Sequence, residues 1–368
     1  MALSLCIFAA CSAPSQKTAP SDSKSLPKHP PLPVGQVSPG RYMTCARAGH
    51  TATTLPDFTV LIAGGRDEHG VVLATTEVYD PTTEKFTAAG KMTVPRQGHI
   101  AAVLEDSKII IAGGSTRGGA VLSSSEDYDY ETGKFTVRGN MHAHRARMTA
   151  TVLRDGRVLV AGGESTQPLD SAETYDVLTG KWTLVGKMTS ARAGHSATLL
   201  ADGQVLIAGG MGAHHAALAS AEIFDPKTNK FTATTSLREA RSLYTSALLT
   251  TGKVFIAGGT AGDSKPLASA EIYDPASASF TTIGKMTESR FKLSAAALLL
   301  DGRVLIVGGA ASVEIYDRRN GMFQTAAGSL DNARYDAAAI QLMDGSTRIF
   351  GGADSQGAST AKSWIYRP

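Results

Sequence analysis

The stretch Asp202-Gly203-Gln204-Val205-Leu206-Ile207-Ala208-Gly209-Gly210 decides the fold of this chain. Its Asp-Gly pair predicts a two-residue hairpin turn, because glycine supplies the positive φ that such a turn needs. The apolar run after the turn predicts a strand buried on both faces, which ends at the two glycines. The glycine pair recurs seven times in 368 residues, beginning at Gly64, Gly113, Gly162, Gly209, Gly258, Gly308 and Gly351. Repetition at intervals of 43 to 50 residues predicts a repeat architecture.

Each repeat predicts four short antiparallel strands. The first strand is made of small and apolar residues and is followed by the turn and the buried second strand. A third strand carries Glu-x-aromatic, as in Glu222 and Phe224, and a fourth carries an aromatic residue seven positions later, as in Phe231. Four such strands in each repeat, stacked around an axis, form a propeller blade. The units start at Arg47, Arg96, Arg145, Arg192, Arg241, Arg290 and Arg334.

The glycine pair, the third-strand tyrosine and the fourth-strand Trp or Phe resemble the kelch repeat, over residues 36–368. This resemblance implies an all-β kelch β-propeller, and the seven units predict seven blades, with six as the alternative. The unit of Arg334 stops before a fourth strand. In five other units the fourth-strand aromatic residue stands six residues before a Met or Leu, and Val37 stands six residues before Met43 in the same way. An N-terminal strand at residues 36–38 is therefore expected to complete the C-terminal blade and close the ring.

The N-terminus predicts export and a lipid anchor. Residues 1–10 are an apolar signal segment, and Cys11 resembles the lipidated cysteine of a bacterial lipobox. Residues 11–33 form a Pro- and Ser-rich tether, and residues 34–368 form the propeller. No apolar run of about 18 residues occurs, so the lipid anchor is the expected membrane contact. We expect an exported, lipid-anchored protein of the bacterial cell envelope, with a secreted protein as the alternative.

Composition excludes several classes of protein. The net charge is only +3 and no basic run is present, so nucleic acid is not an expected partner. Three cysteines are too few for a disulfide framework. No P-loop, dinucleotide fingerprint or nucleophile motif interrupts the repeats. A monomer without a cofactor and without assigned catalytic residues is expected.

Two sets of residues recur at positions that predict scaffolding. The unit arginine occurs in all seven units and the third-strand glutamate in six, with Trp364 in its place in the seventh, which predicts buried ion pairs. The position three residues after the unit arginine is expected at the mouth of the central channel. In four of the units this position is occupied by His50, His99, His195 or Tyr244. Histidine is a common metal ligand, but these lie on different blades, so we interpret them as packing and hydrogen-bonding residues and predict no metal site.

The loops after the glycine pairs form the candidate binding face. They vary in sequence, whereas the turns of the opposite face are short and uniform. Ligands often bind variable loops that a rigid scaffold displays. The candidate residues are Arg66, Asp67, His69, Arg117, His214, His215, Asp263, Lys265 and Asp354.

The prediction for function is a non-enzymatic module at the cell envelope that binds a protein or a glycan. The alternative, implied by the kelch resemblance, is a carbohydrate-active enzyme: a sugar mutarotase or a copper oxidase. Propellers host both activities, so the fold does not decide between them.

Overall fold

The computed structural model describes residues 32–262, 265–292 and 295–368. The signal segment, Cys11, residues 11–31 of the tether and Asp263 lie outside the described residues. Within the described ranges, no helix is long and apolar enough to cross a membrane.

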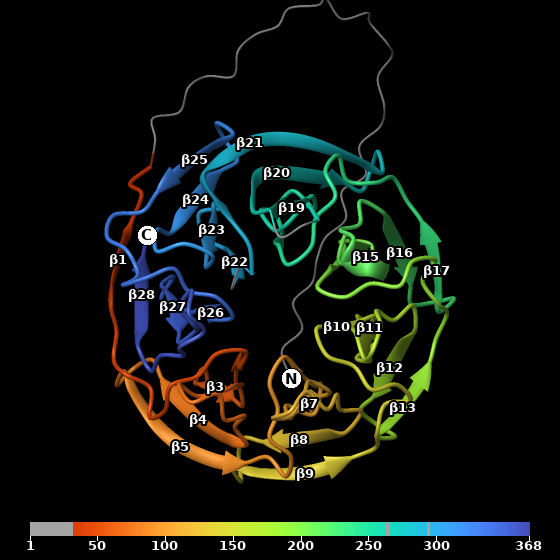
Figure 1. Ribbon diagram of the computed structural model, residues 1–368, viewed down its shortest axis with the longest axis vertical. Helices are drawn as coiled ribbons and strands as arrows, with labels where there is room; N and C mark the ends of the chain where they lie inside the picture. The colour runs from red at the N-terminus through yellow and green to blue at the C-terminus, as the bar shows by residue number, and fades with distance from the viewer. Residues whose placement is uncertain (1–31, 263–264, 293–294) are drawn as a thin grey trace, which may run out of the picture. The chain divides into compact units, whose positions relative to one another are not determined.

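Seven four-stranded antiparallel sheets follow one another around a ring (Figure 1). A single short 3-10 turn, η1 (Ala213–His215), interrupts the β-structure of the described chain. This arrangement confirms the predicted seven-bladed all-β propeller, and the alternative of six blades is wrong. From inner to outer strand, the blades are: blade 1, β2 (Thr51–Thr54), β3 (Val60–Ala63), β4 (Thr75–Asp80) and β5 (Lys85–Lys91); blade 2, β6 (Ile100–Val103), β7 (Ile109–Ala112), β8 (Ser125–Asp129) and β9 (Lys134–Arg138); blade 3, β10 (Thr149–Val152), β11 (Val158–Ala161), β12 (Ala172–Asp176) and β13 (Lys181–Leu184); blade 4, β14 (Ser196–Leu199), β15 (Val205–Ala208), β16 (Ala221–Asp225) and β17 (Lys230–Ala233); blade 5, β18 (Thr245–Leu248), β19 (Val254–Ala257), β20 (Leu267–Asp274) and β21 (Ser279–Arg290); blade 6, β22 (Ala295–Leu298), β23 (Val304–Val307), β24 (Glu314–Asp317) and β25 (Met322–Thr325); blade 7, β26 (Ala338–Gln341), β27 (Thr347–Phe350), β28 (Ser363–Arg367) and β1 (Gln36–Pro39).

The ring closes through its first strand. Strand β1 pairs antiparallel with β28, with Val37 opposite Tyr366, and in Figure 1 the red β1 lies beside the blue β28. The side chain of Val37 is buried in a cluster with Trp364 and Leu330. The fourth strand of blade 7 is therefore supplied by the N-terminus, as the sequence predicted.

The first glycine of the pair in blade 4 is explained by the close approach of the next blade. The second strand of blade 4, Val205–Ala208, is fully buried, as its apolar run predicts. A Cβ on Gly209 would lie 2.7 Å from the carbonyl oxygen of Arg241 and 2.9 Å from the ring of Tyr244 in blade 5. Gly209 also holds a φ of 58°, which is strained for other residues. The first glycine of the pair therefore marks a contact between blades, whereas the second, Gly210, lies against Ala193 and His195 of its own blade.

Six buried ion pairs hold the third strand to the segment before the first strand of the same blade. In blade 4, Arg192 also donates to the carbonyl oxygen of Gly209 at 2.6 Å, and Glu222 accepts from the backbone N–H of Thr189 at 2.8 Å. Blade 7 lacks the glutamate, and Arg334 pairs with Asp331 at 2.7 Å and lies over the Trp364 ring. The predicted ion pairs are confirmed, and each lies within one blade. They are Arg47–Glu77 (2.9 Å), Arg96–Glu126 (2.9 Å), Arg145–Glu173 (2.7 Å), Arg192–Glu222 (2.9 Å), Arg241–Glu271 (3.0 Å) and Arg290–Glu314 (2.7 Å).

Candidate functional site

The predicted channel-mouth residues lie at the seams between innermost strands. Each of three polar side chains contacts a hydroxyl group on the preceding blade, and in blade 3 the apolar Met148 packs in one cluster with Ile100. Burial is the main cause that lowers the pKa of His50, His99 and His195 to about 3, and the unit arginine three residues before each histidine lowers it further. These imidazoles are therefore neutral at pH 7. The contacts of three of these side chains support their interpretation as packing and hydrogen-bonding residues between neighbouring blades. They are His99 Nε2 with Thr51 Oγ1 (3.1 Å), His195 Nε2 with Thr149 Oγ1 (2.9 Å) and Tyr244 OH with Ser196 Oγ (2.8 Å).

His50 is the exception among these side chains. It is 7% exposed, and neither ring nitrogen has a hydrogen-bond partner among the described residues. The position that Thr51 occupies relative to His99 is taken in blade 7 by Ala338, which has no hydroxyl. The seam between blades 7 and 1 therefore lacks a hydrogen bond that the neighbouring seam has.

Adding a hydroxyl at one seam and removing it at the other should change the free energy of unfolding in opposite directions. We expect Ala338→Thr to raise the free energy of unfolding by about 1 kcal/mol, because it offers His50 a partner. We expect Thr51→Ala to lower it by about 1–2 kcal/mol, because it leaves His99 without one. Denaturant unfolding of both variants measures the effect. A change of the same sign in both would contradict this account of the seams.

A series of backbone hydrogen bonds, which we call the belt, runs around the central axis on the loop face. The loop face is the face that carries the loops after the glycine pairs. The members of the belt lie two residues after each unit arginine, and all seven have positive φ. Four are not glycine, and such residues in the left-handed region are uncommon and cluster at functional sites. They are Arg147 (53°), Leu243 (53°), Lys292 (48°) and Asp336 (54°).

The belt runs through six of the seven seams. Each bond joins the N–H of one member to the carbonyl oxygen of the member before it, as from Gly49 to Asp336 at 2.8 Å. Between Lys292 and Asp336 the part of the chain that the structure describes contains no such bond. Blades 6 and 7 therefore meet differently from their neighbours at this face.

A cleft of about 320 Å³ opens at this place on the loop face, where blades 6, 7 and 1 meet. The loop after the glycine pair of blade 6 is the shortest of the seven, residues 310–313, so no long loop covers the seam. The residue after the unit arginine is aromatic only in blades 6 and 7, as Phe291 and Tyr335. We call this site the loop-face cleft. Its lining residues are Arg66, Phe291, Lys292, Tyr335, Asp336, Ala353, Asp354, Ser355 and Gly357.

The loop-face cleft combines an aromatic pair with charges of both signs. The rings of Phe291 and Tyr335 lie 5.4 Å apart at 48°. The guanidinium of Arg66 lies 3.4 Å from the carboxylate of Asp336, and it also donates to the Gln97 side chain at 3.3 Å. Both partners of the Arg66–Asp336 pair are about one-third exposed, so the pair positions its groups and remains accessible to a ligand.

The structure brings two of the predicted binding residues together, Arg66 and Asp354. The Asp354 carboxylate accepts from the backbone N–H of Gln356 at 2.9 Å and so shapes its loop. Asp67 does the same in blade 1, accepting from the N–H of Val71 at 2.8 Å. These two carboxylates therefore have a structural role that their equivalent positions in the repeat explain.

Among the described residues, the other predicted binding residues do not line the cleft. His69 lies in the same loop of blade 1 as Arg66, and Arg117, His214, His215 and Lys265 lie in blades 2, 4 and 5. The side chains of His69, Arg117 and Lys265 are exposed. His214 and His215 lie in η1, and His215 Nδ1 is 3.4 Å from Met211 Sδ. In the described ranges, no group of three or more His, Cys, Asp or Glu side chains is placed to hold a metal ion.

Four lining residues lie outside the loops from which the candidates were chosen, and the sequence analysis missed them: Phe291, Lys292, Tyr335 and Asp336. For Phe291 and Tyr335, the signal that could have found them is a departure from the repeat in two consecutive units. At the position of the two aromatic residues the other units have Ala48, Gln97, Ala146, Ala193 and Ser242.

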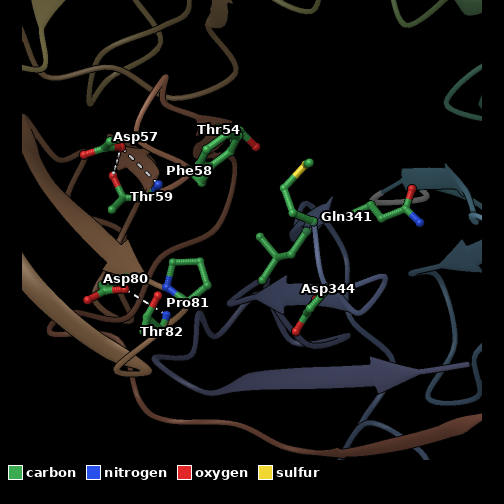
Figure 2. Close-up of a pocket in the computed structure, with 11 residues that line it drawn as sticks. Thr54, Asp57, Phe58, Thr59, Asp80, Pro81, Thr82, Gln341 and Asp344 are labelled. Atoms are coloured by element: carbon green, nitrogen blue, oxygen red, sulfur yellow. Dashed lines mark hydrogen bonds between the residues drawn. The ribbon is translucent and has the colours of Figure 1, made fainter.

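Grooves also occur on the opposite face, which we call the hairpin-turn face. Figure 2 shows one of about 480 Å³ between blades 1 and 7, with Thr54 and Phe58 on one side and Gln341 and Asp344 on the other. Similar grooves lie between blades 3 and 4, 4 and 5, and 5 and 6. Because they recur between blades, they follow from the repeat.

The fold is a seven-bladed β-propeller, and three of its repeats carry the Kelch motif. The Kelch motif matches residues 145–189, 191–238 and 241–287, which correspond to blades 3, 4 and 5. Among solved structures the chain is similar to a fungal alcohol oxidase of the AA5 family in complex with copper, at a TM-score of 0.74 and 17% identity, covering 91% of this chain and 76% of that one. At this identity the likeness shows the fold alone. No curated protein matches the sequence.

Proposed function

We propose that this kelch propeller is a non-enzymatic binding module whose ligand occupies the loop-face cleft. One observation carries the proposal: several departures from the repeat coincide at a single place. The short loop of blade 6, the two aromatic residues and the missing belt bond all lie where blades 6, 7 and 1 meet. Departures that carried no function would have no reason to gather at one seam.

A neutral glycan is the ligand that the cleft fits best. Aromatic side chains give a rigid apolar surface for a sugar ring, and their polar neighbours provide donors and acceptors for its hydroxyls. Arg66 and Lys292 are balanced by Asp336 and Asp354, so the lining carries no net charge that would select an ionic ligand. A standard protein interface covers roughly 800 Å² per partner and would extend far beyond this cleft. A protein ligand is therefore the second candidate.

The proposed setting is the bacterial cell envelope. The apolar segment 1–10 followed by Cys11 supports export and acylation, and the Pro- and Ser-rich residues 12–33 support a tether between lipid and propeller. A binding module held in this way would keep its ligand site within the reach of the tether from the membrane.

Binding to a glycan array tests the proposal. The full chain carrying Cys11→Ser should bind a set of neutral glycans saturably and release them unchanged in mass. Tyr335→Ser should weaken binding at least tenfold, because it removes one ring of the aromatic pair. Tyr335→Phe keeps the ring and should retain most of the affinity. Tyr42→Ser, at an exposed tyrosine outside the cleft, is the matched control.

Three results would contradict the proposal. Chemical conversion of a bound sugar would favour the alternative, an enzyme of the kelch type. Retention of an envelope protein without any glycan binding would favour a protein ligand. Equal loss of glycan binding in the Tyr335 and Tyr42 variants would place the site elsewhere.

A further inference from the structure

Three large apolar side chains are exposed on neighbouring blades of the hairpin-turn face. Leu300 of blade 6 is 80% exposed, Met343 of blade 7 is 76% exposed and Phe58 of blade 1 is 57% exposed. All three lie in the turn between the first and second strands. At the position of Leu300 and Met343, blades 2 to 5 carry Glu105, Arg154, Ala201 and Thr250. Among the described turns between first and second strands, exposed large apolar side chains therefore occur only in this sector of the ring, which we call the turn patch: Phe58, Leu300 and Met343.

The turn patch is continuous across the two seams. Between blades 1 and 7 it borders the groove of Figure 2, whose lining includes Phe58, Pro81, Leu342 and Met343. Between blades 7 and 6, a Cβ on Gly345 would lie 3.1 Å from the Leu300 side chain, so Leu300 reaches the turn of blade 7. Solvent-facing apolar groups gathered in this way mark an interaction surface.

The N-terminal part of the chain joins the propeller beside the turn patch. The carbonyl oxygen of Pro33 accepts a hydrogen bond of 2.6 Å from Arg303, which lies three residues after Leu300. The carbonyl oxygen of Val34 accepts one of 3.3 Å from Tyr366, at the hairpin-turn end of β28. Pro33 and Val34, among the first described residues of the chain, therefore lie at the hairpin-turn face.

We propose that the turn patch rests on a lipid bilayer, so that the hairpin-turn face is turned to the membrane and the loop-face cleft away from it. This inference rests on the proposed anchoring through Cys11, which would hold the patch near the lipid. Phe, Leu and Met side chains gain free energy on entering the apolar part of a bilayer. The patch is too small for a stable protein interface.

Neutral lipid is the expected surface. The groove beside the patch is lined by Asp57, Asp80 and Asp344 and by no basic residue. Attraction to anionic headgroups is therefore not the driving force, and anionic lipid should not increase contact.

Lipid quenching of tryptophan reporters tests this orientation. The full chain with Cys6→Ser and Cys45→Ser is coupled through Cys11 to a maleimide lipid in phosphatidylcholine vesicles that contain brominated lipid. The native Trp182 and Trp364 are buried and give a constant background. The fluorescence of a Met343→Trp reporter should fall by about half and shift to the blue. Leu178→Trp, at a 91%-exposed position of blade 3 on the same face, and His69→Trp, on the loop face, should change little.

The proposal would be overturned by equal quenching of all three reporters, by equal quenching at positions 343 and 178, or by no quenching at position 343. Concentration-dependent dimerisation of the chain without vesicles that Leu300→Ser abolishes would also overturn it, because the patch would then contact a second copy. Failure here would be distinct from failure of the glycan-binding proposal, since that proposal is measured on the uncoupled chain without lipid.

Discussion

Replacing Glu222 by alanine is expected to lower the free energy of unfolding by about 3–5 kcal/mol, because it leaves a buried charge without its partner. The Arg192 guanidinium and the Glu222 carboxylate are both fully buried, 2.9 Å apart. The loss would also remove the acceptor for the backbone N–H of Thr189. Chemical denaturation monitored by tryptophan fluorescence measures the change.

The matched control for Glu222→Ala is Glu131→Ala, at an exposed glutamate in a turn of blade 2. It should change the free energy of unfolding by less than about 0.5 kcal/mol. Similar effects of the two substitutions would mean that the ion pairs do not hold the blades together.

Deleting residues 34–40 is the second change with a large expected effect, since it removes β1 from blade 7. The deletion exposes the pairing edge of β28 and uncovers the cluster in which Val37 packs against Trp364. We expect the free energy of unfolding to fall by about 3–5 kcal/mol and the Tm by roughly 5–10 °C. Differential scanning calorimetry gives the shift.

A deletion of the same length within residues 20–26 serves as the control for the missing strand. It leaves β1 intact and should leave the Tm within about 1 °C of the full chain. If the two deletions had the same effect, closure of the ring by β1 would not contribute to stability.

The scaffold was predictable from the sequence because its physical requirements recur in most of the seven blades. The turn glycines, the buried second strands and the Arg–Glu pairs appear at fixed spacing, so each unit supports the interpretation of the others. Even the closing strand at Val37 could be found, since its distance from Met43 follows the same rule.

The candidate site was only partly predictable, since it depends on which departures from the repeat come together in space. Arg66 and Asp354 were selected from variable loops, but His214 and Lys265 were selected for the same reason and lie elsewhere. Tyr335 and Phe291 stand before their first strands, where the repeat is otherwise regular, so a search restricted to the loops missed them. Their contact of 5.4 Å across a seam is visible only in three dimensions.

The most direct test of the account is hydrogen–deuterium exchange of the full chain in the presence of the neutral glycan that scores highest on the array. The central claim is that the ligand binds where the repeat is broken. We predict protection confined to peptides around residues 66–72, 290–292, 334–337 and 353–358, with no change in the turns of the hairpin-turn face. Protection of the loops of blades 3 to 5 alone, or of the hairpin turns, would contradict the claim.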